Sequence, residues 1–201
     1  MLDPFSVTAF TPAQAWEMAC NLVENCGASH IDERRQLTKE IMPLSVRILR
    51  PLDKTIPAGF PWRQEQLDLY ARQYLNPRND QGFTYTYGER IGVQLSDVML
   101  MLRAHPETRR ATIVLRRPED LLEESAPCLS LLDFKIRGSE LYTTAIFRSH
   151  DIKQAAFANY YGIGRIIEWL CKMLLCKAGP LMVYSLSAHI IIEGGTWPPE
   201  W

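Results

Sequence analysis

The sequence predicts an α+β fold, in which a mixed sheet of about five or six strands packs with one central buried helix. Short segments of alternating or β-branched apolar residues, typical of strands, are separated by segments with the three- and four-residue apolar spacing of helices. Residues 157–176 form one long, mostly apolar segment, expected to be the buried helix. The 201 residues are 47% hydrophobic, enough for one sizeable core, so we expect a single domain over residues 1–201.

The N-terminal half is expected to contain three helices and two strands. Thr11 is a good N-cap and is followed by Pro12, which favours a helix start, while Gly27 favours its end. Later segments alternate as strands do or share one apolar helical face. In chain order, the expected elements are a helix over 12–26, a strand over 46–50, a helix over 64–75, a short aromatic strand over 83–88 and a helix over 94–102.

The C-terminal half is expected to supply most of the sheet. A strand of β-branched residues precedes two strands that Arg137-Gly138-Ser139-Glu140 would join as a hairpin. The long apolar helix and a last strand follow. The expected ranges are strands over 111–115, 129–136 and 141–147, a helix over 157–176 and a strand over 182–192.

Charge and cysteine usage limit the possible partners and compartment. A formal net charge of −1 and a pI near 6.4 give no overall electrostatic signature of nucleic-acid or membrane binding, so any bound anion should be small. Five cysteines without regular spacing argue against a disulfide framework. With neither a signal-peptide pattern nor an apolar run long enough to span a membrane, the sequence predicts a cytoplasmic protein.

Cys128 is the best candidate for a reactive side chain. It follows Ala126-Pro127, and Arg148 and Asp151 come one short hairpin later. A thiol near an arginine and a carboxylate is typical of a nucleophile beside an anion site. An isolated cysteine is more often structural, so the case depends on its surroundings, and the other four cysteines read as small hydrophobic residues.

Six short motifs together resemble those of thymidylate synthase and of the related pyrimidine-nucleotide hydroxymethylases. Their order and spacing agree with that family over roughly residues 82–192, and the short form of the chain is most like the compact archaeal branch. The family's fold implies that one face of the sheet forms a dimer interface. The motifs are Tyr87-Gly88-Glu89-Arg90, Arg109-Arg110, Ala126-Pro127-Cys128, Arg148-Ser149-His150-Asp151, Phe157-Ala158-Asn159 and Ala188-His189.

The resemblance implies a nucleophile and a phosphate site. In this family a thiolate adds to C6 of the pyrimidine ring and thereby makes C5 nucleophilic, which is the role implied for Cys128. Arg148 would favour the thiolate and bind the nucleotide phosphate, with Ser149 as a further donor. Arg109 and Arg110 match a pair that crosses a twofold interface to the partner's phosphate, so a homodimer is expected. Without the resemblance, this pair reads as a solvated turn.

The resemblance also implies residues that contact the base, the sugar and the cofactor. Asn159 can donate to a carbonyl and accept from an imide N–H, which matches uracil, whereas an aspartate here would suit cytosine. Tyr87 is assigned to the nucleotide and His189 to the sugar 3′-hydroxyl. Asp151 would order a water near the cofactor, and Phe157 would contact the cofactor. Taken alone, Asn159 reads more commonly as a satisfied buried amide, and His189 equally well as a core histidine.

Several positions depart from the family pattern. Leu129 follows the nucleophile where histidine is usual, and Ile191 replaces a tyrosine that binds the sugar, which leaves deoxyribose and ribose both open. Gln154-Ala155 replaces residues that pack on the folate ring, and the tail 197–201 lacks the usual small apolar end. A carrier such as tetrahydromethanopterin would suit the last two changes.

The expected reaction is transfer of a one-carbon unit from methylene-tetrahydrofolate or methylene-tetrahydromethanopterin to C5 of dUMP, giving dTMP, without a metal. Glu65 is the best candidate for the acid/base glutamate by its order along the chain, and Glu89 is a weaker one. Arg47 and Arg50 are candidates for a further phosphate arginine by position alone. The alternatives are a hydroxymethylase of dCMP or CMP and a nucleotide-binding homologue without catalysis.

Overall fold

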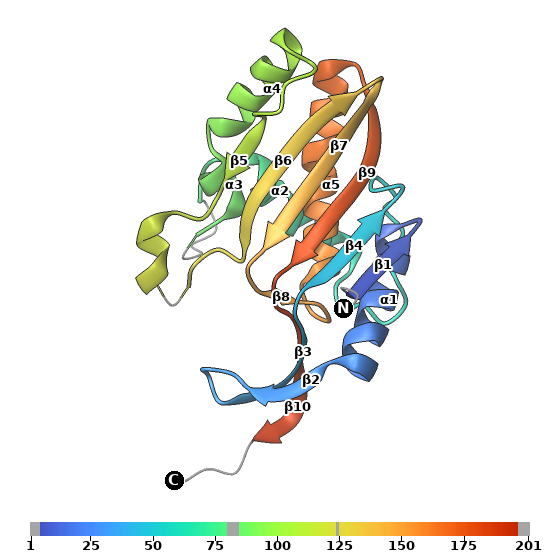
Figure 1. Cartoon of the computed structure of the whole chain (residues 1–201), viewed down its shortest axis with the longest axis vertical. Coiled ribbons are helices and arrows are strands. Elements are labelled where there is room, and N and C mark those ends of the chain that lie inside the picture. The colour runs from blue at the N-terminus through green and yellow to red at the C-terminus, as the bar shows by residue number, and fades with distance from the viewer. Residues whose placement is uncertain (1–4, 80–84, 124, 197–201) are drawn as a thin grey trace.

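The computed structural model describes residues 5–79, 85–123 and 125–196, with backbone only for 193–196 (Figure 1). Its helices are α1 (Pro12–Cys26), α2 (Gln64–Leu75), α3 (Tyr87–Ile91), α4 (Gln94–Ala104) and α5 (Ala156–Leu174), with a 3₁₀ helix η1 (Pro118–Leu122). Its strands are β1 (Phe5–Ala9), β2 (Ala28–Ile31), β3 (Gln36–Ile41), β4 (Leu44–Ile48), β5 (Thr112–Val114), β6 (Leu129–Arg137), β7 (Glu140–Phe147), β8 (His150–Asp151), β9 (Lys177–Ser185) and β10 (Ala188–Thr196). The chain therefore has the predicted α+β class.

The strands form two mixed sheets. One has six strands in the order β1-β4-β9-β7-β6-β5, and the other has four in the order β2-β3-β10-β8. In Figure 1 the six-stranded sheet lies above the strands β2, β3 and β10, and the helices α2 and α5 lie behind it. Within the part of the chain that the structure describes, no helix covers the front face of this sheet.

The helix α5 is buried because it is apolar nearly all round. Ile163, Ile166 and Leu170 are fully buried against the sheet and the neighbouring helices. Gly162 allows α2 to approach closely, since a Cβ there would lie 2.3 Å from Cε2 of Tyr74. This contact brings one face of α2 against the part of α5 that carries the site residues.

The structure confirms most of the predicted elements and corrects two. The predicted strand over 182–192 is wrong as one element, because β9 ends at Ser185 and a new strand begins at Ala188 in the other sheet. The predicted strand over 83–88 is wrong where it can be checked: Thr86 accepts a hydrogen bond from the Glu89 N–H and caps α3. Residues 83 and 84 lie outside the described residues. The strands β1, β2 and β3 were missed.

Replacing Gly88 by alanine should destabilise the fold strongly. A Cβ at this position would lie 2.0 Å from the backbone oxygen of Gln73 and 2.1 Å from that of Asn76. Backbone at a helix end cannot move away as a side chain can, so we expect a loss of about 3 kcal/mol in the free energy of unfolding. Urea denaturation measures this value.

The matched control is Gly164→Ala in α5. Its added Cβ would meet only the Pro51 oxygen, at 3.1 Å, and alanine favours a helix by about 1 kcal/mol over glycine. Near-equal stabilities of the two variants would contradict the close approach at Gly88.

Candidate active site

A cavity of about 500 Å³ opens where the two sheets meet. Most of the predicted site residues line it, although they come from α3, the start of β6, the β7–β8 segment, α5 and β10. The residues that the fold brings together here are Tyr87, Cys128, Arg148, Ser149, Asp151, Asn159 and His189.

Two short segments cross side by side between the sheets at the base of this cavity. Arg148-Ser149 connects β7 with β8, and Leu186-Ser187 connects β9 with β10. The Leu186 N–H donates to the Phe147 carbonyl at 2.9 Å, and the His150 N–H donates to the Ser187 carbonyl at 2.8 Å. The parallel pairing of β7 with β9 thus continues across the junction as β8 with β10. This arrangement fixes the backbone of Arg148 and Ser149.

Arg148 is bound to the segment that carries Cys128. Its Nε donates to the Pro127 carbonyl at 3.1 Å and its Nη2 to the Ala126 carbonyl at 2.9 Å. Its backbone N–H donates to the Cys128 carbonyl at 2.9 Å. Arg148 is therefore hydrogen-bonded to the backbone of the segment that carries Cys128, so the two residues belong to one unit of the fold.

The electrostatic environment of Cys128 is mixed. Burial is the largest influence and raises the pKa of the thiol, whereas Arg148, Arg34 and Arg116 lower it. Burial prevails, so the pKa stays above its usual value. The predicted effect of Arg148 has the expected sign, but within one chain it does not suffice to ionise the thiol at neutral pH.

Asn159 is held by side chains on both of its amide atoms. It is 3% exposed, and its Oδ1 accepts hydrogen bonds from the hydroxyls of Tyr70, at 2.6 Å, and Tyr74, at 2.9 Å. Its Nδ2 lies 3.1 Å from Nε2 of His150. The two tyrosines are one helical turn apart on α2, so one face of that helix reaches the amide.

His150 is a buried, neutral ring. It is 1% exposed and stacks on Phe147 with 3.9 Å between ring centroids and 3° between planes. Its Nδ1 lies 2.8 Å from Oγ of Ser185. Burial, with a smaller contribution from His189, lowers the pKa of His150 to about 3. The neutral ring carries its single proton on one of the two nitrogens, and the other nitrogen can accept a hydrogen bond.

Asp151 and His189 sit on paired strands at the edge of the cavity. β8 and β10 run parallel, with Asp151 opposite His189 in register. Oδ1 of Asp151 accepts from the Gln154 N–H at 2.9 Å, and both residues are only partly buried. Their side chains are available to a ligand.

Four of the predicted site residues lie elsewhere. Among the residues described, the cavity lining does not include Glu65, which is exposed near the start of α2, or Phe157, which is fully buried against Phe60. Arg109 and Arg110 are exposed just before β5 at the edge of the six-stranded sheet. Neither belongs to the described lining of the cavity in its own chain.

The cavity also contains residues that the sequence did not indicate. Arg34 comes from the turn between β2 and β3, Arg116 follows β5, and Tyr70 and His150 complete the wall. In the sequence, Arg34 belongs to the charged run Asp32-Glu33-Arg34-Arg35, and this run is the feature that could have indicated it as a site residue. In the sequence, Tyr70 reads as part of an apolar helix face. His150 lies inside the motif Arg148-Ser149-His150-Asp151, but its residue type alone suggested no role. Arg47 and Arg50, the candidates for a further phosphate arginine, are not among the described residues that line this cavity.

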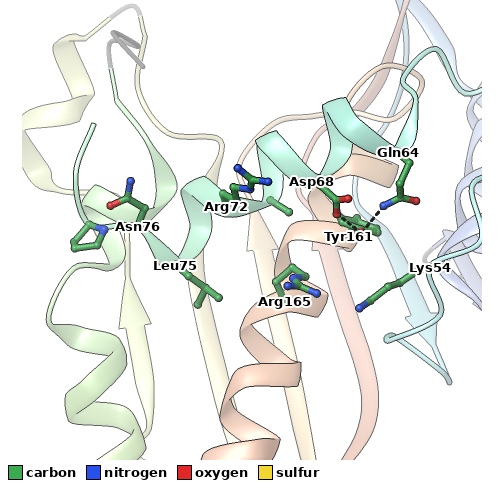
Figure 2. A pocket seen from close by; sticks show the side chains of 10 residues that line it. Lys54, Gln64, Asp68, Arg72, Leu75, Asn76, Tyr161 and Arg165 are labelled. Atoms are coloured by element: carbon green, nitrogen blue, oxygen red, sulfur yellow. Dashed lines mark hydrogen bonds between the residues drawn. The ribbon is translucent and has the colours of Figure 1, made fainter. Parts of the chain in front are cut away.

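A second hollow of about 740 Å³ lies between α2 and α5 (Figure 2). Gln64 donates to the hydroxyl of Tyr161, which donates to Asp68 at 2.7 Å and lowers the pKa of that carboxyl. Lys54 and Arg165 both form ion pairs with Glu168. The described lining of this hollow contains none of the predicted site residues, so the cavity around Cys128 is the candidate active site.

Two further observations concern metal sites and membrane spans. Among the described residues, no group of three or more His, Cys, Asp or Glu side chains is placed to hold a metal ion. The helices that the structure describes are too short or too polar to cross a membrane.

The sequence of this chain is similar to those of known proteins. The family model described as Thymidylate synthase matches residues 58–193. A protein of Methanosarcina mazei named "Putative thymidylate synthase" is 37% identical over 185 residues, covering 89% of this chain and 85% of its own length. One of the same name from Methanothermobacter thermautotrophicus is 35% identical over 207 residues, covering 92% and 93%. Such a match implies a pyrimidine nucleotide substrate, a folate-type co-substrate and typically a dimer. The chain thus belongs to the thymidylate synthase family and is an enzyme of its one-carbon transferase type.

Proposed function

We propose that this enzyme transfers the one-carbon unit of a methylene pterin to C5 of dUMP and forms dTMP through a covalent bond between Cys128 and C6. The observation that carries the proposal is the shared cavity, in which Cys128 and Arg148 form one hydrogen-bonded unit and Asn159 lines the same space. A nucleophile, a phosphate ligand and a base-reading amide are three of the groups that this reaction requires.

The chemistry begins with addition of the Cys128 thiolate to C6. This bond makes C5 enamine-like and places negative charge on O4 of the ring, which the remaining N–H of Asn159 stabilises. Because burial keeps the thiol protonated in one chain, ionisation needs more positive charge than Arg148 supplies alone. Arg34 and Arg116 already act in that direction.

The phosphate site combines Arg148, Ser149 and Arg34 with two arginines of the partner chain. Arg109 and Arg110 are exposed beside the edge of the sheet and would reach the phosphate across a twofold homodimer axis.

The open face of the six-stranded sheet is the proposed dimer interface. Side chains on this face include Tyr184, which is 40% exposed, and its neighbour in register Ile146. A partly exposed apolar sheet face of this kind is typical of a surface that a partner covers.

The residues around Asp151 fit a pterin co-substrate. The Asp151 carboxylate lines the cavity and can accept from the N–H groups of a pterin ring, whereas Phe157 is fully buried and reaches a pterin only after a side-chain movement. When bound, the methylene pterin supplies the carbon unit and, in a synthase, the reducing hydride. Both tetrahydrofolate and tetrahydromethanopterin carriers suit this carboxylate. Free thiols at all five cysteines accord with the cytoplasm as the proposed compartment.

The experiment that tests the function is tritium release from 5-tritiated dUMP, dCMP and CMP with each methylene pterin, followed by product identification. Release from dUMP with dTMP as product supports the synthase. Hydroxymethyl products from dCMP or CMP would support the hydroxymethylase. Ile191 lines the cavity where the family has a sugar-binding tyrosine, so both deoxyribose and ribose substrates are included in the test. Absence of release from all three would leave a nucleotide-binding homologue.

The base preference gives a further prediction. We expect dUMP to bind more tightly than dCMP by about ten- to a hundredfold, because a mispaired buried edge costs roughly 1–3 kcal/mol. Asn159→Asp should shift the preference toward dCMP, since a protonated carboxyl can pair with the N3/N4 edge of cytosine. Calorimetry of both nucleotides with both proteins measures the shift. Tighter binding of dCMP or CMP by the native enzyme would replace the synthase with the hydroxymethylase.

A further inference from the structure

We propose that His150, together with Tyr70 and Tyr74, fixes the orientation of the Asn159 amide and thereby sets the preference for uracil over cytosine. This inference rests on the proposed function, in which Asn159 reads the base. His150 acts through Asn159 and is a positioning residue.

The first step concerns the oxygen of the amide. A carbonyl oxygen has two lone pairs, and in Asn159 these accept from the two tyrosine hydroxyls at 2.6 and 2.9 Å. Tyr74 is fully buried and packs at 2.3 Å from where a Cβ of Gly162 would lie, so its ring cannot withdraw easily. Oδ1 is thus saturated and is a poor acceptor for an amino group or for the imide N–H that the sequence led us to expect there, so the base is read through the amide nitrogen.

The second step concerns the nitrogen of the amide. Nδ2 carries two hydrogens, and one of them points to Nε2 of His150 at 3.1 Å. Because Asn159 lines the cavity, the second hydrogen is the group that a bound ring meets. Asn159 therefore presents a donor, which suits the O4 carbonyl of uracil and opposes the N4 amino group of cytosine.

The third step concerns the tautomer of His150. For Nε2 to accept from Asn159, the ring proton must lie on Nδ1, and Oγ of Ser185 accepts it there at 2.8 Å. The stack on Phe147 and an edge contact with Tyr160, 6.0 Å between centroids at 83°, prevent rotation of the ring. If the proton moved to Nε2, the amide would have to turn over and offer the opposite group.

The test compares two replacements of His150. His150→Phe keeps the stacked ring and removes the acceptor, so the ratio of dCMP to dUMP dissociation constants should fall about tenfold or more toward one. His150→Gln places a side-chain oxygen near the former Nε2, so the ratio should stay within about threefold of native. Calorimetry with both nucleotides gives the ratio. A general loss of structure would weaken both nucleotides alike and leave the ratio unchanged.

A second measurement needs no nucleotide. Imidazole ¹⁵N NMR of the native protein should show Nδ1 protonated and Nε2 unprotonated for His150 near neutral pH. A proton on Nε2, or a His150→Phe protein that binds dUMP with native affinity and keeps the native ratio, would overturn the inference. If the native protein binds neither nucleotide, the proposed function fails, while the NMR result still decides how the amide is oriented.

Discussion

Cys128→Ala is expected to abolish turnover, by on the order of 10⁴-fold or more, and to leave dUMP binding within about tenfold of native. In the proposed mechanism the thiol forms the bond to C6, whereas ground-state affinity comes from the phosphate and base contacts. Arg148 stays in place in the variant because it is bound to the backbone of Ala126 and Pro127 and not to the cysteine side chain. Single-turnover kinetics and calorimetry measure the two effects separately.

The controls are Cys171→Ala and Cys176→Ala. Cys171 is buried near the end of α5 and Cys176 follows that helix, so both changes should lower stability without affecting the chemical step. A Cys128→Ala protein that methylates or hydroxymethylates a pyrimidine nucleotide at a near-native rate would remove the nucleophile from the proposal.

Mixing two inactive variants should restore activity if the site is shared between chains. Arg110→Ala removes a phosphate ligand supplied to the partner, and Cys128→Ala removes the nucleophile of its own site. In a heterodimer of the two, the chain that keeps Cys128 receives Arg110 from its partner, so one of two sites is complete. A random mixture should recover up to about a quarter of native activity, measured after dissociation and reassociation.

The control mixture combines two separate preparations of the Arg110→Ala variant. It should gain no activity on mixing. The exposed position of Arg110, outside the described lining of its own cavity, is what makes the exchange informative. Full activity in a monomer, or failure of the mixed chains to recover, would contradict the shared site.

Local patterns in the sequence predicted the helices and strands in which apolar residues recur at a regular spacing. The bounds of α2 agree with the apolar spacing over 64–75, and the hairpin of β6 and β7 agrees with its turn at 137–140. The strands β2 and β3 are largely polar or half exposed, so their pairing depends on β10, which is distant in sequence. Alternation cannot reveal such a strand, and it also cannot show that β9 and β10 belong to different sheets.

The residues of the candidate site were likewise predictable only in part. The cysteine, arginine and asparagine motifs have chemical types that suggest roles, and the fold brings them to one cavity. Tyr70 and His150 could not be assigned, because their roles arise from hydrogen bonds to Asn159 that join three separate elements. Glu65 was chosen by chain order alone, and order does not determine which face of α2 a residue occupies.

The doubled crossing between the two sheets has a mechanical consequence. Two separate links, bonded to each other at Phe147–Leu186 and His150–Ser187, resist a hinge motion in a way that a single connecting strand does not. Arg148 and Ser149 lie within one of these links, so the proposed phosphate-binding donors are rigid before a nucleotide arrives and binding does not have to order them.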